Sequence, residues 1–174
     1  MDLNHYLAEL DNNTRNTLDI VDKYSATELL FKEEETCSIA DLLEHICISD
    51  NRTINLLKSD TTSVAATEEL YGDARLQQIV VDYQGGPKIT ETELRELQGA
   101  VTDYSSFEAI FTPQREALKQ ALLSGEIAIT HKTYPHQYLG DMTVTDWLKY
   151  IIYHTNRHLN DIMADSMEFK KSIS

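Results

Sequence analysis

Glycine and proline are scarce in this sequence, with six and three residues among 174. Both mark tight turns, so their scarcity disfavours an all-β architecture. Cysteine is scarcer still, because Cys37 and Cys47 are too few for a disulfide framework. Cys47 lies near the apolar stripe of its own helical segment, where a reduced cysteine serves as a small core residue. We therefore expect a mainly helical protein without disulfides.

Positively charged residues are also few. The sequence has 15 lysines and arginines against 29 aspartates and glutamates, which gives a net charge of −14. The basic residues are scattered singly among carboxylates, whereas nucleic acids and anionic membranes are bound by clusters of lysine and arginine. We expect neither as a partner. Apolar runs are too short to cross a membrane, and the first residues lack the basic and apolar regions of a signal peptide. These features predict a cytoplasmic protein.

With 41% hydrophobic and 25% charged residues, the composition predicts one globular domain over residues 1–174. Apolar residues recur at helical spacing in four long regions. These regions are residues 3–23, 38–57, 90–124 and 143–164. The fold class that we expect is therefore all-α, a four-helix bundle, with a short helical or loop excursion (residues 58–89) between the second and third helices.

Capping and breaking residues set the expected helix boundaries. Ser38 is placed to cap the second helix with an acidic residue three positions later, and Thr90 to cap the third. Pro113 should kink or divide the third helix because proline lacks the amide proton of a helix interior. Gly125 should end it. A brief extended piece is expected at 127–130.

Two histidines stand on the buried face of the last helix. His154 and His158 are four residues apart, so their rings are neighbours on one helix face. They share the apolar stripe of Trp147, Leu148 and Ile151. A buried polar group without a partner costs about 1–3 kcal/mol. One metal ion would satisfy both rings together.

The second helix offers a third imidazole. His45 lies at the edge of its apolar stripe, and Asp50 lies within the stripe. Three neutral imidazoles from two helices can hold a divalent transition ion and leave a position open. Asp50 could accept the second ring N–H of one ligand. The alternative is that the histidines hydrogen-bond backbone or carboxylates at the edge of the bundle, and spacing alone leaves both interpretations open.

Two stretches resemble a known family. They are SIADLLEHICISDN (residues 38–51) and YPHQYLGDMTVTDWLKYIIYHTNRHLNDI (residues 134–162), which are similar to the DinB/YfiT superfamily of four-helix-bundle proteins. The matching features are a proline–histidine pair, a glycine, a threonine helix cap, a tryptophan and then H-x-x-x-H. They fall on Pro135, His136, Gly140, Thr143, Trp147, His154 and His158, and the family's second-helix histidine falls on His45.

The resemblance implies that His45, His154 and His158 bind a divalent metal, zinc or nickel first, with iron(II) and manganese also compatible with imidazole. It implies a homodimer and a small-molecule substrate, a low-molecular-weight thiol being one candidate. Characterised relatives include thiol S-transferases that use bacillithiol or mycothiol. We therefore expect a metal-dependent enzyme with thiol S-transferase-like or hydrolase-like chemistry. The alternative is a non-catalytic bundle that binds a metal or a small molecule.

Other polar residues near the trio have simpler interpretations. Arg157 could meet an anionic substrate, but an ion pair with Asp161 one turn later explains it as well. Tyr153 falls on the far side of the last helix, outside the expected site. His131 and His136 precede that helix, and each is a fourth ligand, a proton shuttle or an ordinary loop histidine.

Overall fold

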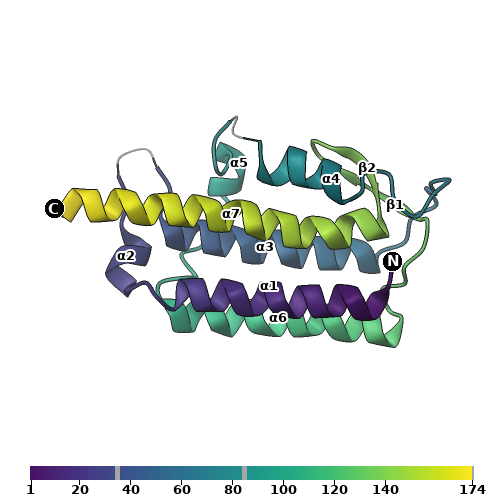
Figure 1. The fold of residues 1–174 in the computed structure, drawn as a ribbon, viewed down its shortest axis with the longest axis horizontal. Helices are drawn as coiled ribbons and strands as arrows, with labels where there is room; N and C mark the ends of the chain where they lie inside the picture. The colour runs from purple at the N-terminus through teal and green to yellow at the C-terminus, as the bar shows by residue number, and fades with distance from the viewer. Residues whose placement is uncertain (34–35, 84–85, 174) are drawn as a thin grey trace.

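The computed structural model describes residues 1–33, 36–83 and 86–173. Four long helices form the bundle: α1 (Leu3–Val21), α3 (Ile39–Lys58), α6 (Tyr104–Ser124) and α7 (Val144–Ile173). Helices α1 and α3 each pack against both α6 and α7 (Figure 1). The predicted all-α four-helix bundle is confirmed.

The expected capping residues begin and end these helices. At the start of α3, the Asp41 amide donates to the Ser38 hydroxyl at 3.0 Å, and the Ser38 amide donates to the Asp41 carboxylate at 2.9 Å. This reciprocal pair satisfies two amides that the helix itself leaves without acceptors. Gly125 ends α6 in the left-handed region, at φ 80°, which a residue with a side chain rarely adopts.

A buried polar layer separates two hydrophobic clusters along the bundle. One cluster gathers around Leu10 and Leu118, and the other gathers around Leu43 and Phe111. Between them one buried polar residue from each long helix belongs to a single hydrogen-bonded group centred on Arg115. These four residues, Asn13, Asp50, Arg115 and Thr155, are called the polar layer below. The fold therefore places charge and hydrogen bonds at mid-height in its own core.

The excursion between α3 and α6 covers one side of the bundle. It carries α4 (Asp73–Leu76), a π-helical turn (Gln77–Val81) and α5 (Glu91–Leu94), which lie over α3 and α7 in Figure 1. The buried carboxylate of Asp146 at the start of α7 accepts the amides of Leu70 at 2.9 Å and Tyr71 at 3.2 Å. These bonds hold the excursion against the bundle.

The third helical region differs from the prediction. Thr90 caps a helix as expected, but that helix is α5 and it ends at Leu94. The amides of Gln98 and Gly99 then donate to the buried carboxylate of Glu44, at 2.7 and 3.1 Å, and this tertiary contact replaces the helical bonds. A separate helix, α6, starts after the cap Asp103.

Three further boundaries differ from the sequence-based expectations. Pro113 does not divide α6, whose buried residues on both sides of the proline pack into the bundle. The extended structure lies at β1 (Thr133–His136) and β2 (Gly140–Thr143), an antiparallel pair, and not at 127–130. The short helix α2 (Ala26–Leu30) was not predicted, although Ser25 and Glu28 form its capping box.

The last helix is longer than predicted. Helix α7 reaches residue 173 and not 164, because the sequence beyond 164 contains no glycine or proline to end it. None of the helices in the described part of the chain combines the length and apolarity needed to cross a membrane.

Candidate metal centre

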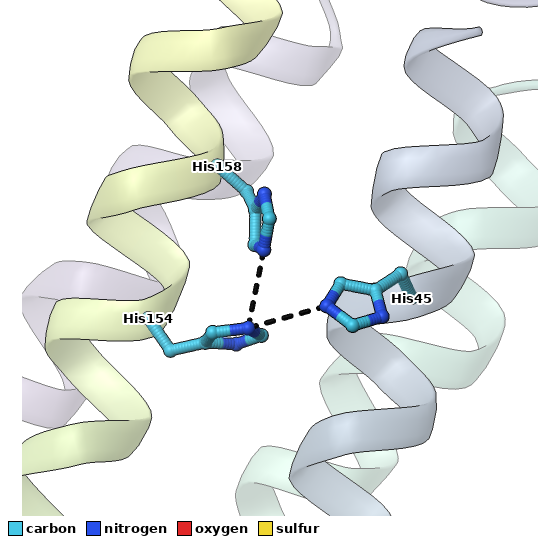
Figure 2. A group of neighbouring side chains, drawn as sticks. All are labelled: His45, His154 and His158. Carbon is cyan, nitrogen blue, oxygen red and sulfur yellow. Dashed lines mark hydrogen bonds between the residues drawn. The ribbon is translucent and has the colours of Figure 1, made fainter. Parts of the chain in front are cut away.

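Three buried histidines meet between α3 and α7. His45 points from α3, and His154 and His158 point from α7, towards one spot (Figure 2). The Nε2 atom of His154 lies 3.2 Å from Nε2 of His45 and 3.1 Å from Nε2 of His158. Imidazoles bound to one tetrahedral zinc at about 2.0–2.1 Å place their nitrogens about 3.3 Å apart. The spacing therefore suits a shared ion.

Carboxylates face the outer nitrogens of two of the three rings. Nδ1 of His158 lies 3.1 Å from the carboxylate of Asp161 on the same helix. Nδ1 of His45 lies 3.8 Å from the carboxylate of Glu93 on α5. A carboxylate at Nδ1 favours the proton there and leaves Nε2 with a free lone pair, which is the form that binds a metal.

Hydrogen bonding within the trio leaves one nitrogen unsatisfied. Nδ1 of His154 is buried and has no partner among the described residues. A proton on Nε2 of His154 leaves that Nδ1 as an unpaired acceptor. A proton on Nδ1 leaves an unpaired donor there and, when the other two rings are also protonated at Nδ1, brings three lone pairs together at the Nε2 atoms. Either arrangement is unfavourable by itself. A cation bound by the three Nε2 atoms removes the repulsion, so these residues fit a metal ion.

The electrostatic environment keeps two of the ligands neutral. Burial, together with the charges of His158 and Arg52, lowers the pKa of His45 to about 3. Burial also lowers the pKa of His154 well below its usual value. Because only the neutral ring has a lone pair for a metal, both residues are ready to bind at neutral pH without losing a proton.

Metal-free protein is expected to lose stability as the pH falls. The pKa of His45 is 6.5 in an unfolded chain but about 3 in the fold. At a pH between these two values the unfolded state binds more protons than the folded state. The contribution of His45 to the free energy of unfolding is therefore fully present above pH 6.5 and is lost as the pH falls towards about 3. The free energy of unfolding, measured with urea from about pH 7.5 to about pH 4, should show this loss. In His45→Gln this free energy should fall less steeply as the pH is lowered. Equal slopes would contradict the expectation.

Among the described contacts, Asp50 pairs with Arg115 and not with a ring nitrogen of the trio. Its carboxylate accepts a hydrogen bond from Nε of Arg115 at 2.8 Å within the polar layer. Burial raises the pKa of Asp50, and the Arg115 guanidinium opposes this. The residues that face the outer ring nitrogens are Asp161 and Glu93. Asp161 follows His158 by three positions and could have been found from helical spacing, whereas Glu93 comes from α5 and gives no such signal.

The other polar residues considered in the sequence analysis lie at different positions in the structure. Arg157 lies 3.7 Å from the Asp161 carboxylate, the ion pair that spacing suggests, and it also donates to the Val80 carbonyl at 3.1 Å. Tyr153 donates to Asp73 at 3.1 Å, on the far side of α7 as expected. His131 is exposed and does not belong to the cluster of potential metal ligands.

The β1–β2 hairpin brings His136 beside the trio. The indole N–H of Trp147 donates to the Tyr134 carbonyl at 3.0 Å and holds the hairpin on α7. Nδ1 of His136 accepts two backbone amides of the hairpin, and burial lowers its pKa to about 4. Tyr150, which sequence reasoning did not select, stacks on His154 with ring centroids 5.2 Å apart.

Two cavities open onto the histidines. The first has a volume of about 500 Å³ and the second about 490 Å³. They share one wall, which is made of His45, Glu93, His136, Tyr138, Tyr150 and His154. A ligand in either cavity could therefore reach the point where the Nε2 atoms meet.

The family comparison agrees with this geometry. The family model described as the DinB superfamily matches residues 9–162, which include all three histidines. Neither the curated proteins nor the solved structures contain a match to the chain. DinB-like proteins are metal-binding helical bundles, and three converging imidazoles are a fitting donor set for a divalent transition ion. By its sequence match and its fold, the chain belongs to the DinB superfamily.

Proposed function

We propose that this protein is a metal-dependent enzyme whose ion is held by His45, His154 and His158, with zinc or nickel as the first candidates. The observation that carries the proposal is the convergence of three buried Nε2 atoms at the shared wall of two cavities. A divalent ion bound there would lower the pKa of a coordinated water or thiol. The protein residues would orient the rings, through Asp161 and Glu93, and enclose the reactants.

The nucleophile is expected to come from the substrate and not from the protein. Cys47 is buried and lines neither cavity at the histidines. Burial also raises the pKa of its thiol, which disfavours the reactive thiolate. Activation of an external water or thiol therefore suits this site better than covalent catalysis by a side chain.

Two adjoining cavities favour a transfer between two molecules over hydrolysis of one. Outside the common wall the first cavity is lined by residues of α3, among them Ser49, Arg52 and Thr53, whereas the second is lined by Ile79 and Val80 of the excursion and by Arg157 of α7. Different linings suit different reactants that meet at the common wall. A thiol S-transferase-like reaction, in which a low-molecular-weight thiol adds to an electrophile, fits this arrangement.

A conjugation assay tests the proposal. Zinc- or nickel-loaded protein is incubated with a panel of small thiols, bacillithiol and mycothiol included, and 1-chloro-2,4-dinitrobenzene. We expect thioether formation that stops with a chelator and returns when metal is added back. Metal-dependent hydrolysis of 4-nitrophenyl acetate without thiol would favour the hydrolase. Stoichiometric metal with neither activity would favour the non-catalytic metal-binding alternative.

A further inference from the structure

The hairpin fixes which nitrogen of His136 carries its proton. Nδ1 lies 3.1 Å from the amide nitrogen of Tyr138 and 3.2 Å from that of Leu139. Backbone amides can only donate, so Nδ1 must be the unprotonated acceptor. A ring turned over would present a carbon to both amides and leave them unpaired. In the neutral ring the proton therefore sits on Nε2, which becomes a permanent donor.

A second donor lies beside it. The Tyr150 hydroxyl and Nε2 of His136 have no hydrogen-bond partner among the described residues. Some side-chain atoms of these residues are both fully buried and without a partner, but neither of the two donors is one of them. Those atoms are Gln114 Oε1, Thr145 Oγ1 and His154 Nδ1. Both donors thus keep access to solvent, and both residues line the two cavities. Each donor is available to a molecule in the site.

Packing holds the two donors close to the histidine trio. The rings of His136 and Tyr150 meet edge to face with centroids 5.0 Å apart, and Tyr150 is stacked on His154. Trp147 covers His136 with a centroid distance of 5.3 Å and meets Tyr150 edge to face at 5.5 Å. Rings fixed in this way present their donors with little loss of conformational freedom when a ligand binds.

We infer that His136 and Tyr150 bind an acceptor oxygen of the substrate next to the three-histidine cluster. Both groups are uncharged donors, and Glu93 is the charged side chain of the wall that the two cavities share, whereas Arg52 and Arg157 each line one cavity alone. A neutral acceptor oxygen therefore suits this wall better than an anion. The oxygen is therefore of the carbonyl type, as in an amide, ester, enone or hydroxamate. His136 is accordingly a substrate-binding residue and not a fourth metal ligand. This inference rests on the proposed metal-dependent function.

Binding of a small probe to cobalt(II)-loaded protein tests the inference. Acetohydroxamate carries a carbonyl oxygen, and its dissociation constant can be followed in the visible spectrum of the metal. Tyr150→Phe and His136→Asn should each weaken its binding about tenfold, since each removes one hydrogen bond. Ethanethiol, which has no oxygen, should bind wild type and variants alike, within about twofold.

The choice of variants separates donation from folding. Asparagine at 136 keeps an oxygen for the two hairpin amides but does not reach the place of Nε2. His136→Gln places an amide nitrogen farther out and should recover part of the affinity. Cobalt content and thermal unfolding, measured on every variant, show whether the trio and the fold remain intact.

A spectroscopic measurement adds an independent readout. Long-range ¹H–¹⁵N spectra of the metal-free protein should show His136 with a protonated Nε2 and an unprotonated Nδ1. A protonated Nδ1, or unchanged acetohydroxamate affinity in cobalt-loaded Tyr150→Phe and His136→Asn, would overturn this inference alone. Wild-type protein that binds no cobalt, zinc or nickel would overturn the proposed function, which is a different result.

Discussion

Substituting His154 by alanine is expected to remove the bound metal almost completely. The Nε2 atom of His154 is the vertex of the trio, within 3.2 Å of both other Nε2 atoms. Its loss leaves two imidazoles, on different helices, for an ion that needs three. Removing a residue that only hydrogen-bonds a metal ligand lowers metal affinity by up to about 100-fold. Removing the ligand itself should therefore lower metal affinity by more than about 100-fold. Elemental mass spectrometry of untagged protein should show near-stoichiometric metal in wild type and a trace in the variant.

His131→Ala is the matched control, because His131 is an exposed histidine outside the cluster of potential metal ligands. It should keep the wild-type metal content. His154→Ala should also keep its helical circular dichroism, since the bundle is built on two hydrophobic clusters that do not include the ring. Retained metal in His154→Ala would show that the ligand set is wrong. A wild type that refuses added zinc and nickel would end the enzyme hypothesis altogether.

Helical periodicity was enough to find the three histidines, because each lies on or beside a long apolar stripe. Spacing along one helix also contained Asp161, three residues after His158, although its role towards that ring was not foreseen. Glu93 and His136 could not be found in this way. They reach the site from α5 and from the β1–β2 hairpin, and only tertiary contacts place those elements over α3 and α7.

The same limit explains the errors in the fold. The long helices were predictable because each buries a continuous face. Residues 90–124 have helical spacing throughout, yet the amides of Gln98 and Gly99 bind the buried carboxylate of Glu44 from a different helix. Local propensity carries no information about such an acceptor. The last helical region was likewise expected to end at 164, but no glycine or proline follows to end the helix there.

Arg115→Met is expected to destabilise the fold strongly, by about 3–5 kcal/mol, because it leaves the buried carboxylate of Asp50 without its partner. Arg115 joins all four long helices from its place on α6. Its guanidinium donates to Asp50 of α3 at 2.8 Å, to Asn13 of α1 at 2.9 Å and to Thr155 of α7 at 2.8 Å. The melting temperature should fall by about 10 °C or more for a chain of this size. Urea unfolding followed by circular dichroism measures the free energy.

Arg95→Met is the matched control, since the Arg95–Glu91 ion pair has side chains that are 74% and 81% exposed. An exposed pair contributes only about 0–0.5 kcal/mol. The double variant Asp50→Leu with Arg115→Met should be more stable than Arg115→Met alone, because no unpaired charge remains in the core. A loss below about 1 kcal/mol in Arg115→Met would contradict a buried ionic role for the polar layer.

The double variant also separates the stability of the bundle from the alignment of its helices. Thr155 directly follows His154, so the Arg115–Thr155 bond fixes α7 along the bundle axis, while the Arg115–Asp50 bond fixes α3 five residues beyond His45. Apolar side chains can fill the same space but impose no such register, because hydrophobic contact is not directional. Stability should therefore recover in the double variant while zinc affinity stays below that of wild type. Wild-type zinc affinity in this variant would show that the packing of the two hydrophobic clusters alone holds His45 opposite His154.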